Sequence, residues 1–268
     1  MPRSGPVFEW DFNLLLVPMH DFEAAVQWYS EHMGWELQQR IPSSHGEKAF
    51  FGFIVLKAIG AKHDHLTRNP ITDLEGNARL RFAIADYENT LLYFREQGIP
   101  FTELGNDPEG RETIEITAFG GAKLLAVNSP ELQTSSRARL VRTAAIPLEV
   151  GVSDLGASVQ WYTELLGMKL SERSTPEGCR LLQGKRTFQD SWIDMIWLKQ
   201  IPKDQVSRGN SSSRLYFWLG KPDFLRVHEQ LQRNNVEVST ILGNPDGWAV
   251  YHIVDPDGNR TNVSTCAY

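Results

Sequence analysis

The feature that most constrains this chain of 268 residues is a segment that occurs twice. Residues 21–37, DFEAAVQWYSEHMGWEL, return as residues 154–170, DLGASVQWYTELLGMKL, with nine of 17 positions identical at a constant offset of 133. A match of this density, with Trp-Tyr in both copies, indicates an internal duplication. Whatever fold the first half adopts, the second half is therefore expected to repeat.

Each copy has the local pattern of a strand, a capped helix and a glycine stop. An apolar run precedes Asp21 and Asp154, whose short side chains suit the first position of a helix. Apolar residues then follow at helical spacing. Gly34 and Gly167 stand where a helix ends in a residue that tolerates positive φ.

A shorter pattern of strand, helix and three strands occurs twice in each half. One such module has a half-buried sheet and a single amphipathic helix, so it must pair with another module to cover its apolar face. We therefore predict an α+β fold of four βαβββ modules with curved mixed sheets around concave cups. The expected boundaries are an N-terminal domain over residues 1–130, a polar linker over 131–143 and a C-terminal domain over 144–268.

Composition narrows the functional classes. The formal net charge is −6 and the pI is about 5.7, which argues against a general nucleic-acid binder. The first residues show no apolar segment of a signal peptide, and no stretch approaches a membrane span. Two cysteines in a chain of this size suit a reducing compartment. We expect a cytoplasmic protein, with no nucleic-acid or membrane partner.

Several motifs resemble one known superfamily. They are Trp161-Tyr162, Leu166-Gly167 and the turn Asp255-Pro-Asp-Gly-Asn259, with matching residues in the first half at Trp28-Tyr29 and Met33-Gly34. The chain resembles a tandem two-domain member of the vicinal oxygen chelate superfamily, which includes glyoxalase I, bleomycin-resistance proteins and extradiol dioxygenases. The resemblance implies glyoxalase-like domains. It leaves the reaction open, because this fold hosts lyases, transferases, dioxygenases, epimerases and pure binders.

The resemblance also implies a divalent metal that binds two adjacent oxygens of the substrate. The positions that match the usual ligands are Pro147, Arg214 and Asn262 in the second half, and Leu14 or Asn13, Arg79 and Leu124 in the first half. None of these side chains is a usual ligand for a transition metal. We therefore expect no metal triad in either cup and no cofactor, although a divalent metal held by displaced ligands is an open alternative.

The remaining polar candidates are ligand-binding residues. Arg214 and Arg79 both stand at the start of a strand, where the family places an inward residue. A guanidinium at this position could hold a carboxylate or phosphate. The alternative is an arginine that reaches solvent or a neighbouring acid. Glu149 is the candidate catalytic base, or else a charge at the sheet edge. The other candidates are His252, Asn262, Trp197 and Trp218, the two tryptophans either as stacking walls or as sheet packing.

The leading hypothesis is a protein of the glyoxalase and bleomycin-resistance type that binds a small organic molecule in its C-terminal cup without the usual metal, with Glu149 as the base if it is an enzyme. One alternative is a metal-dependent lyase or dioxygenase with ligands drawn from Glu149, His252, His63 and His65. The other is a non-catalytic scaffold. A monomer or a homodimer is expected. Two domains fused in one chain can pair with each other, as single-domain relatives pair by forming a dimer.

Overall fold

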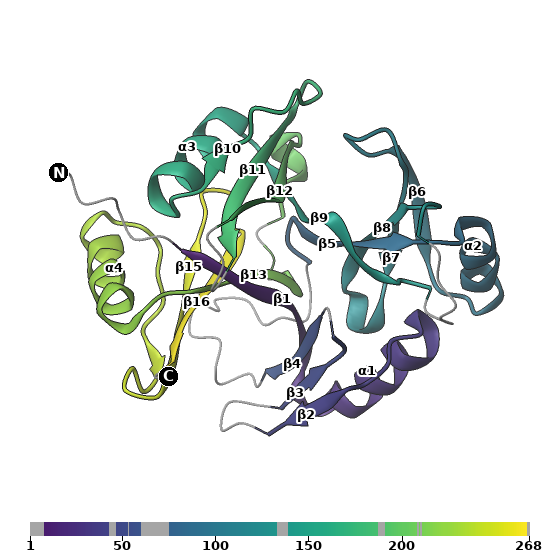
Figure 1. The fold of residues 1–268 in the computed structure, drawn as a ribbon, viewed down its shortest axis with the longest axis horizontal. Helices are drawn as coiled ribbons and strands as arrows, with labels where there is room; N and C mark the ends of the chain where they lie inside the picture. Colours follow the sequence, from purple (N-terminus) through teal and green to yellow (C-terminus); the bar gives the residue numbers. More distant parts are fainter. Residues whose placement is uncertain are drawn as a thin grey trace.

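The computed structural model describes residues 8–42, 47–52, 54–59, 75–132, 139–186, 191–207, 209 and 211–266, and it contains four modules (Figure 1). The first contains β1 (Glu9–Pro18), a 3-10 turn (Met19–Asp21), α1 (Phe22–Trp28), a π-helical turn (Tyr29–Met33), β2 (Gln39–Ile41), β3 (Lys48–Phe50) and β4 (Val55–Ile59). The second contains β5 (Ala78–Ile84), α2 (Tyr87–Glu96), β6 (Phe101–Asn106), β7 (Glu112–Thr117), a 3-10 turn (Phe119–Gly121) and β8 (Lys123–Asn128).

The second half repeats this order. The third module contains β9 (Arg142–Val152), α3 (Leu155–Leu165), β10 (Lys169–Leu170), β11 (Cys179–Arg186) and β12 (Trp192–Gln200). After a 3-10 turn (Lys203–Gln205), the fourth contains β13 (Ser213–Trp218), α4 (Lys221–Arg233), β14 (Leu242–Gly243), β15 (Trp248–Val254) and β16 (Arg260–Cys266). The predicted α+β fold of four modules is confirmed. No helix in the described part of the chain is long and apolar enough to cross a membrane.

The helix ends follow the sequence signals, with one exception. The Asp154 carboxylate accepts a hydrogen bond of 2.9 Å from the backbone N–H of Ala157, and Gly34 and Gly167 both have positive φ. The prediction that the Asp21 side chain caps its helix is wrong, because this carboxylate makes no capping bond and instead lies 3.2 Å from Nε2 of His20. A 3-10 turn at residues 19–21 takes the place of the cap.

Strand pairing joins modules from opposite halves of the chain. β1 pairs antiparallel with β13, and β5 pairs antiparallel with β9. The first module is thus paired with the fourth, and the second with the third, as Figure 1 shows for β1 beside β13. All the strands form one curved sheet, in which β1 and β11 make a short parallel junction. The expected boundaries of two sequential domains stay a prediction. Strands that precede residue 131 nevertheless pair with strands of the second half.

Alternation along the strands gives the sheet two different faces. One face packs under the helices in a large apolar core that includes Leu15, Val17, Leu80 and Phe82. The opposite face carries two small apolar clusters. One is formed by Leu14, Leu16, Val55 and Tyr216, and the other by Ile146, Cys179, Leu181 and Trp197. The first cluster joins the first and fourth modules, and the second lies within the third module.

The Asp255–Asn259 turn joins the two modules of the second half. Asp257 accepts hydrogen bonds from the backbone N–H and the hydroxyl of Ser153, at 2.9 and 2.6 Å. Asp255 accepts a bond of 3.1 Å from the hydroxyl of Tyr162, and the Asn259 amide donates to the carbonyl of Gly151. The motif therefore fixes the fourth module against the end of β9 and the start of α3.

We expect Asp257→Ala to lower the free energy of unfolding by about 2–3 kcal/mol, because two hydrogen bonds to a buried carboxylate are lost. Asp246→Ala is the matched control, since its carboxylate pairs with exposed Lys221 and its loss should cost less than about 1 kcal/mol. Urea unfolding measures both. Equal losses in the two variants would contradict the joining role of the turn.

Candidate functional site

The first candidate surface is the β1–β13 face, defined as the side chains that β1, β3, β4, β13, β15 and β16 direct away from the helices. Its apolar base is the cluster of Leu14, Leu16, Val55 and Tyr216. The strand register places Lys57 beside Leu16 and Arg214 beside Leu14, on opposite sides of β1. Side chains from both halves of the sequence therefore meet on this face.

Lys57 is the most unusual residue on the β1–β13 face. It lies in the buried part of β4 and is only 6% exposed. Burial lowers the pKa of its ammonium to about 7, and the positive charges of Lys48 and Arg214 lower it further. Lys48 lies directly opposite on β3. The charges that act on Lys57 are thus cationic, and a large share of this side chain is neutral near pH 7.

An aromatic ring covers both lysines. Nζ of Lys57 lies 5.1 Å from the ring centroid of Trp248, and Nζ of Lys48 lies 5.5 Å from it. The ring face favours the charged ammonium, in opposition to burial and to the two neighbouring cations. Trp248 is half-buried, so it forms the outer wall of the face while Leu16 and Tyr216 form its base.

Four of the predicted ligand-binding residues lie on this face. Arg214 is 2% exposed, and its guanidinium donates to Oδ1 of Asn262 at 3.3 Å and to the carbonyl of Ser211 at 3.4 Å. His252 pairs in register with Asn262, and its backbone N–H donates to the hydroxyl of Ser239. Trp218 follows two positions after Tyr216 in β13. The structure brings Arg214, Asn262, His252 and Trp218 onto one face.

The other three candidates lie on the second surface, the β5–β9 face, defined as the side chains that β5, β7, β8, β9, β11 and β12 direct away from the helices. Glu149 is 3.4 Å from Lys199 and pairs in register with Arg79 and Trp197. Arg79 is 3.0 Å from Glu115. Trp197 is 2% exposed and packs in the second small apolar cluster, so it follows the sheet-packing alternative.

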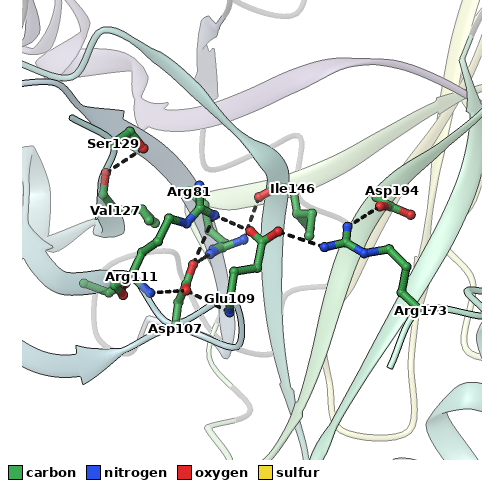
Figure 2. A network of polar contacts seen from close by, with 10 residues as sticks. Arg81, Asp107, Glu109, Arg111, Val127, Ser129, Ile146, Arg173 and Asp194 are labelled. Atoms are coloured by element: carbon green, nitrogen blue, oxygen red, sulfur yellow. Dashed lines mark hydrogen bonds and ion pairs between the residues drawn. The ribbon is translucent and has the colours of Figure 1, made fainter. Parts of the chain in front are cut away.

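A buried ion-pair network occupies the β5–β9 face (Figure 2). Arg81 and Asp107 form an ion pair of 2.5 Å, with both side chains almost fully buried. Arg81 also donates to the carbonyl of Ile146, and Asp107 accepts the backbone N–H groups of Glu109 and Arg111. Burial lowers the pKa of Arg81, and the negative charges of Asp107 and Glu149 oppose this shift.

The network continues from the second module to the third module. Glu109 is 3.1 Å from Arg173, and Arg173 is 2.6 Å from Asp194 on β12 (Figure 2). The 107–111 turn of the second module is thereby tied to the third module. Positive and negative side chains are matched along this face, so its charges are already satisfied within the protein.

The hypothesis that the ligand lies in a C-terminal cup stays a prediction, but the candidate residues are divided between the two faces. That hypothesis assumed that the two modules of one half pair with each other, whereas the strands pair across the halves. Glu149 on β9 and His252 on β15 have five strands between them in the sheet. They do not meet in one site, and His63 and His65 lie outside the described residues.

Lys57 was not among the candidate site residues predicted from the sequence. A signal was present, since Lys57 is the one charged residue in the apolar segment Val55–Ile59, and a lysine at a buried strand position is rare. Trp248 gave no comparable signal, because its place opposite Lys57 depends on the pairing of the first module with the fourth.

The side chains on the β1–β13 face do not fit a divalent metal. Of the positions that match the usual ligands, Leu14, Arg214 and Asn262 lie on this face, and Lys57 lies near them. Divalent metals in proteins take carboxylate, imidazole or thiolate ligands. In the part of the chain that the structure describes, no group of three or more His, Cys, Asp or Glu side chains could hold a metal ion.

Comparisons with known proteins agree with this architecture. Residues 141–263 match the model of the Glyoxalase/Bleomycin resistance protein/Dioxygenase superfamily. Glyoxalase I from Zea mays is similar in structure, with a TM-score of 0.57 and 16% identity over 96% of this chain and 92% of that one. A "putative dioxygenase" from Bacillus subtilis subsp. subtilis str. 168 has a TM-score of 0.62 and 10% identity over 99% of this chain and 87% of that one. At such identities the likeness shows the fold alone. No curated protein matches the sequence.

We expect Arg81→Met to lower the free energy of unfolding by about 3 kcal/mol or more, because it leaves the buried Asp107 carboxylate without its nearest cation. Arg79→Met is the control, since its pair with Glu115 is partly exposed and should cost about 1 kcal/mol or less. Denaturant unfolding compares the two. A cost for Arg81→Met as small as that of the control would contradict the role of the buried pair.

The lowered pKa of Lys57 predicts a specific pH dependence of stability. Between about pH 7 and pH 10.5 the unfolded chain binds a proton at this residue that the folded chain releases, so stability rises with pH in this range. From pH 7.5 to pH 9.0 the wild type should gain roughly 2 kcal/mol relative to Lys57→Met. Urea unfolding at both pH values measures the difference, and parallel stability curves would contradict the lowered pKa.

Proposed function

We propose that this chain, whose residues 141–263 match the model of the Glyoxalase/Bleomycin resistance protein/Dioxygenase superfamily, binds a small organic anion on the β1–β13 face without a metal. The observation that carries the proposal is the gathering of Lys57, Lys48 and Arg214 on one face, where burial and then the charges of Lys48 and Arg214 lower the pKa of Lys57. A bound anion would relieve this repulsion and would be attracted by all three cations.

The surroundings of these cations suit an organic molecule more than an inorganic ion. Trp248 and Tyr216 offer ring surface, and Leu14, Leu16 and Val55 offer an apolar base. Small-molecule sites generally combine such a lining with a few convergent polar groups. Arg214, whose guanidinium is held by its bonds to Asn262 and Ser211, would contribute a charge-assisted contact to a carboxylate.

The β5–β9 face supports binding less well. Its cations already lie beside carboxylates, as in the pairs of Arg79 with Glu115, Arg81 with Asp107 and Arg173 with Asp194. A ligand would have to replace these pairs. Glu149 is likewise held by Lys199, so the candidate base lies away from the cations that would bind an anion. The proposal therefore assigns this face a structural role.

Aryl carboxylates test the proposal. We expect phenylpyruvate or benzoate to raise the melting temperature of the wild type, since a ligand of the folded state stabilises it by mass action. Arg214→Met should weaken binding about 10-fold to 100-fold, because one charge-assisted contact is lost. Arg79→Met is the matched control on the other face and should change the dissociation constant less than about threefold.

Calorimetry with and without EDTA gives the dissociation constants and tests the metal at the same time. Binding that is unchanged by EDTA supports the proposal. Loss of binding in Arg79→Met but not in Arg214→Met would overturn the assignment of the face. About one tightly bound metal per chain, required for binding, would overturn the proposal in favour of a metal-dependent lyase or dioxygenase.

A further inference from the structure

We propose that Lys57 acts as a nucleophilic amine that condenses with the carbonyl group of a small oxo acid held on the β1–β13 face and forms an imine. This inference rests on the proposed function, because it assigns a substrate class and a covalent step to the same site. It is carried by the position of one lysine among cations and by the distance between this lysine and Arg214.

The position of Lys57 differs from that of an ordinary strand lysine. A surface lysine extends its ammonium into water along a flexible stem. Lys57 instead lies between Leu16 on β1 and Lys48 on β3, and its Nζ is covered by the ring of Trp248 on β15. The amine thus lies among residues of the first and fourth modules, and it is desolvated there.

A desolvated amine beside other cations is the environment in which lysines act as nucleophiles. At pH 7 an ordinary lysine with a pKa near 10.4 is neutral in fewer than about one molecule in a thousand. The pKa of Lys57 is about 7, so the neutral amine is abundant at this pH. Lys48 and Arg214 are the neighbouring cations that favour it.

Arg214 defines the class of carbonyl compound. Lys57 and Arg214 lie on the two strands that flank β1, and Arg214 is set back by two residues along the strands. Two strand spacings, together with this offset of two residues, separate the Cα atoms of Lys57 and Arg214 by roughly 12 Å. At that separation, two long side chains can both contact a molecule of a few carbons that lies between them. A carboxylate on Arg214 would then place a nearby carbonyl carbon at Lys57.

The step balances without a further reactant. The lone pair of the neutral Lys57 amine attacks the carbonyl carbon, a C–N bond forms as the C–O π bond breaks, and one amine hydrogen passes to the carbonyl oxygen as a proton. Loss of that oxygen as water, together with both amine hydrogens, leaves the C=N bond. Nothing is oxidised or reduced. Protonation of the imine nitrogen gives a cation that the substrate carboxylate and the Trp248 ring both stabilise.

Reductive trapping tests the inference. The full-length protein is incubated with phenylpyruvate and cyanoborohydride near pH 7.5, and labelled lysines are located by peptide mass mapping. We expect labelling of Lys57 at least about tenfold faster than that of any other lysine, because ordinary lysines are almost wholly protonated at this pH. Phenyllactate, which has the same carboxylate but no carbonyl, should bind and slow the labelling.

Two variants make the test specific. Lys48→Met removes a neighbouring cation, so it should raise the pKa of Lys57 and slow its labelling, whereas Lys123→Met on the β5–β9 face should leave the labelling unchanged. Binding of phenylpyruvate without preferential labelling of Lys57 would overturn the imine and leave the proposed function standing. Absence of binding by both phenylpyruvate and phenyllactate would overturn both.

Discussion

The structure depends on the pairing of the first strands of modules from opposite halves, β1 with β13 and β5 with β9. The first strand of a module is otherwise an open sheet edge with unpaired backbone groups, which a partner strand must cover. The hydroxyls of Ser211 and Ser213 accept the N–H groups of Ala78 and Leu80 and hold the two pairs together. Each face away from the helices therefore takes side chains from both halves, and neither half contains a complete face.

The same scaffold gives these two faces opposite electrostatic characters. Arg79 and Arg214 occupy corresponding places, each the second residue of the first strand of its module. Arg79 meets the carboxylate of Glu115, whereas Arg214 meets the neutral amide of Asn262 and acts on Lys57 as a like charge. One face is neutralised within the protein, which stabilises the fold. The other brings two further cations, Lys48 and Arg214, close to the buried amine of Lys57.

The duplicated helices show a similar divergence. Tyr162 donates to Asp255 in the turn that joins the third and fourth modules, and burial raises the pKa of that carboxyl to about 6. Its duplicate Tyr29 stacks on Trp35, with ring centroids 5.0 Å apart. Asp154 caps its helix, but Asp21 ends a 3-10 turn and makes no capping bond. Identical residues at equivalent places thus take different partners, because the contacts come from segments outside the repeat.

The sequence by itself determined the four modules, the helix stops at Gly34 and Gly167, and the strand positions of Arg79, Arg214 and Asn262. These follow from local rules, since periodicity and φ preferences act over a few residues. Only the tertiary structure decided which modules pair, and hence that Glu149 lies apart from Arg214. It also decided that Lys57 and Trp248 meet. Pairing between strands more than a hundred residues apart depends on which sheet edges and apolar faces fit together in space. A local pattern that is repeated along the chain does not determine which modules pair.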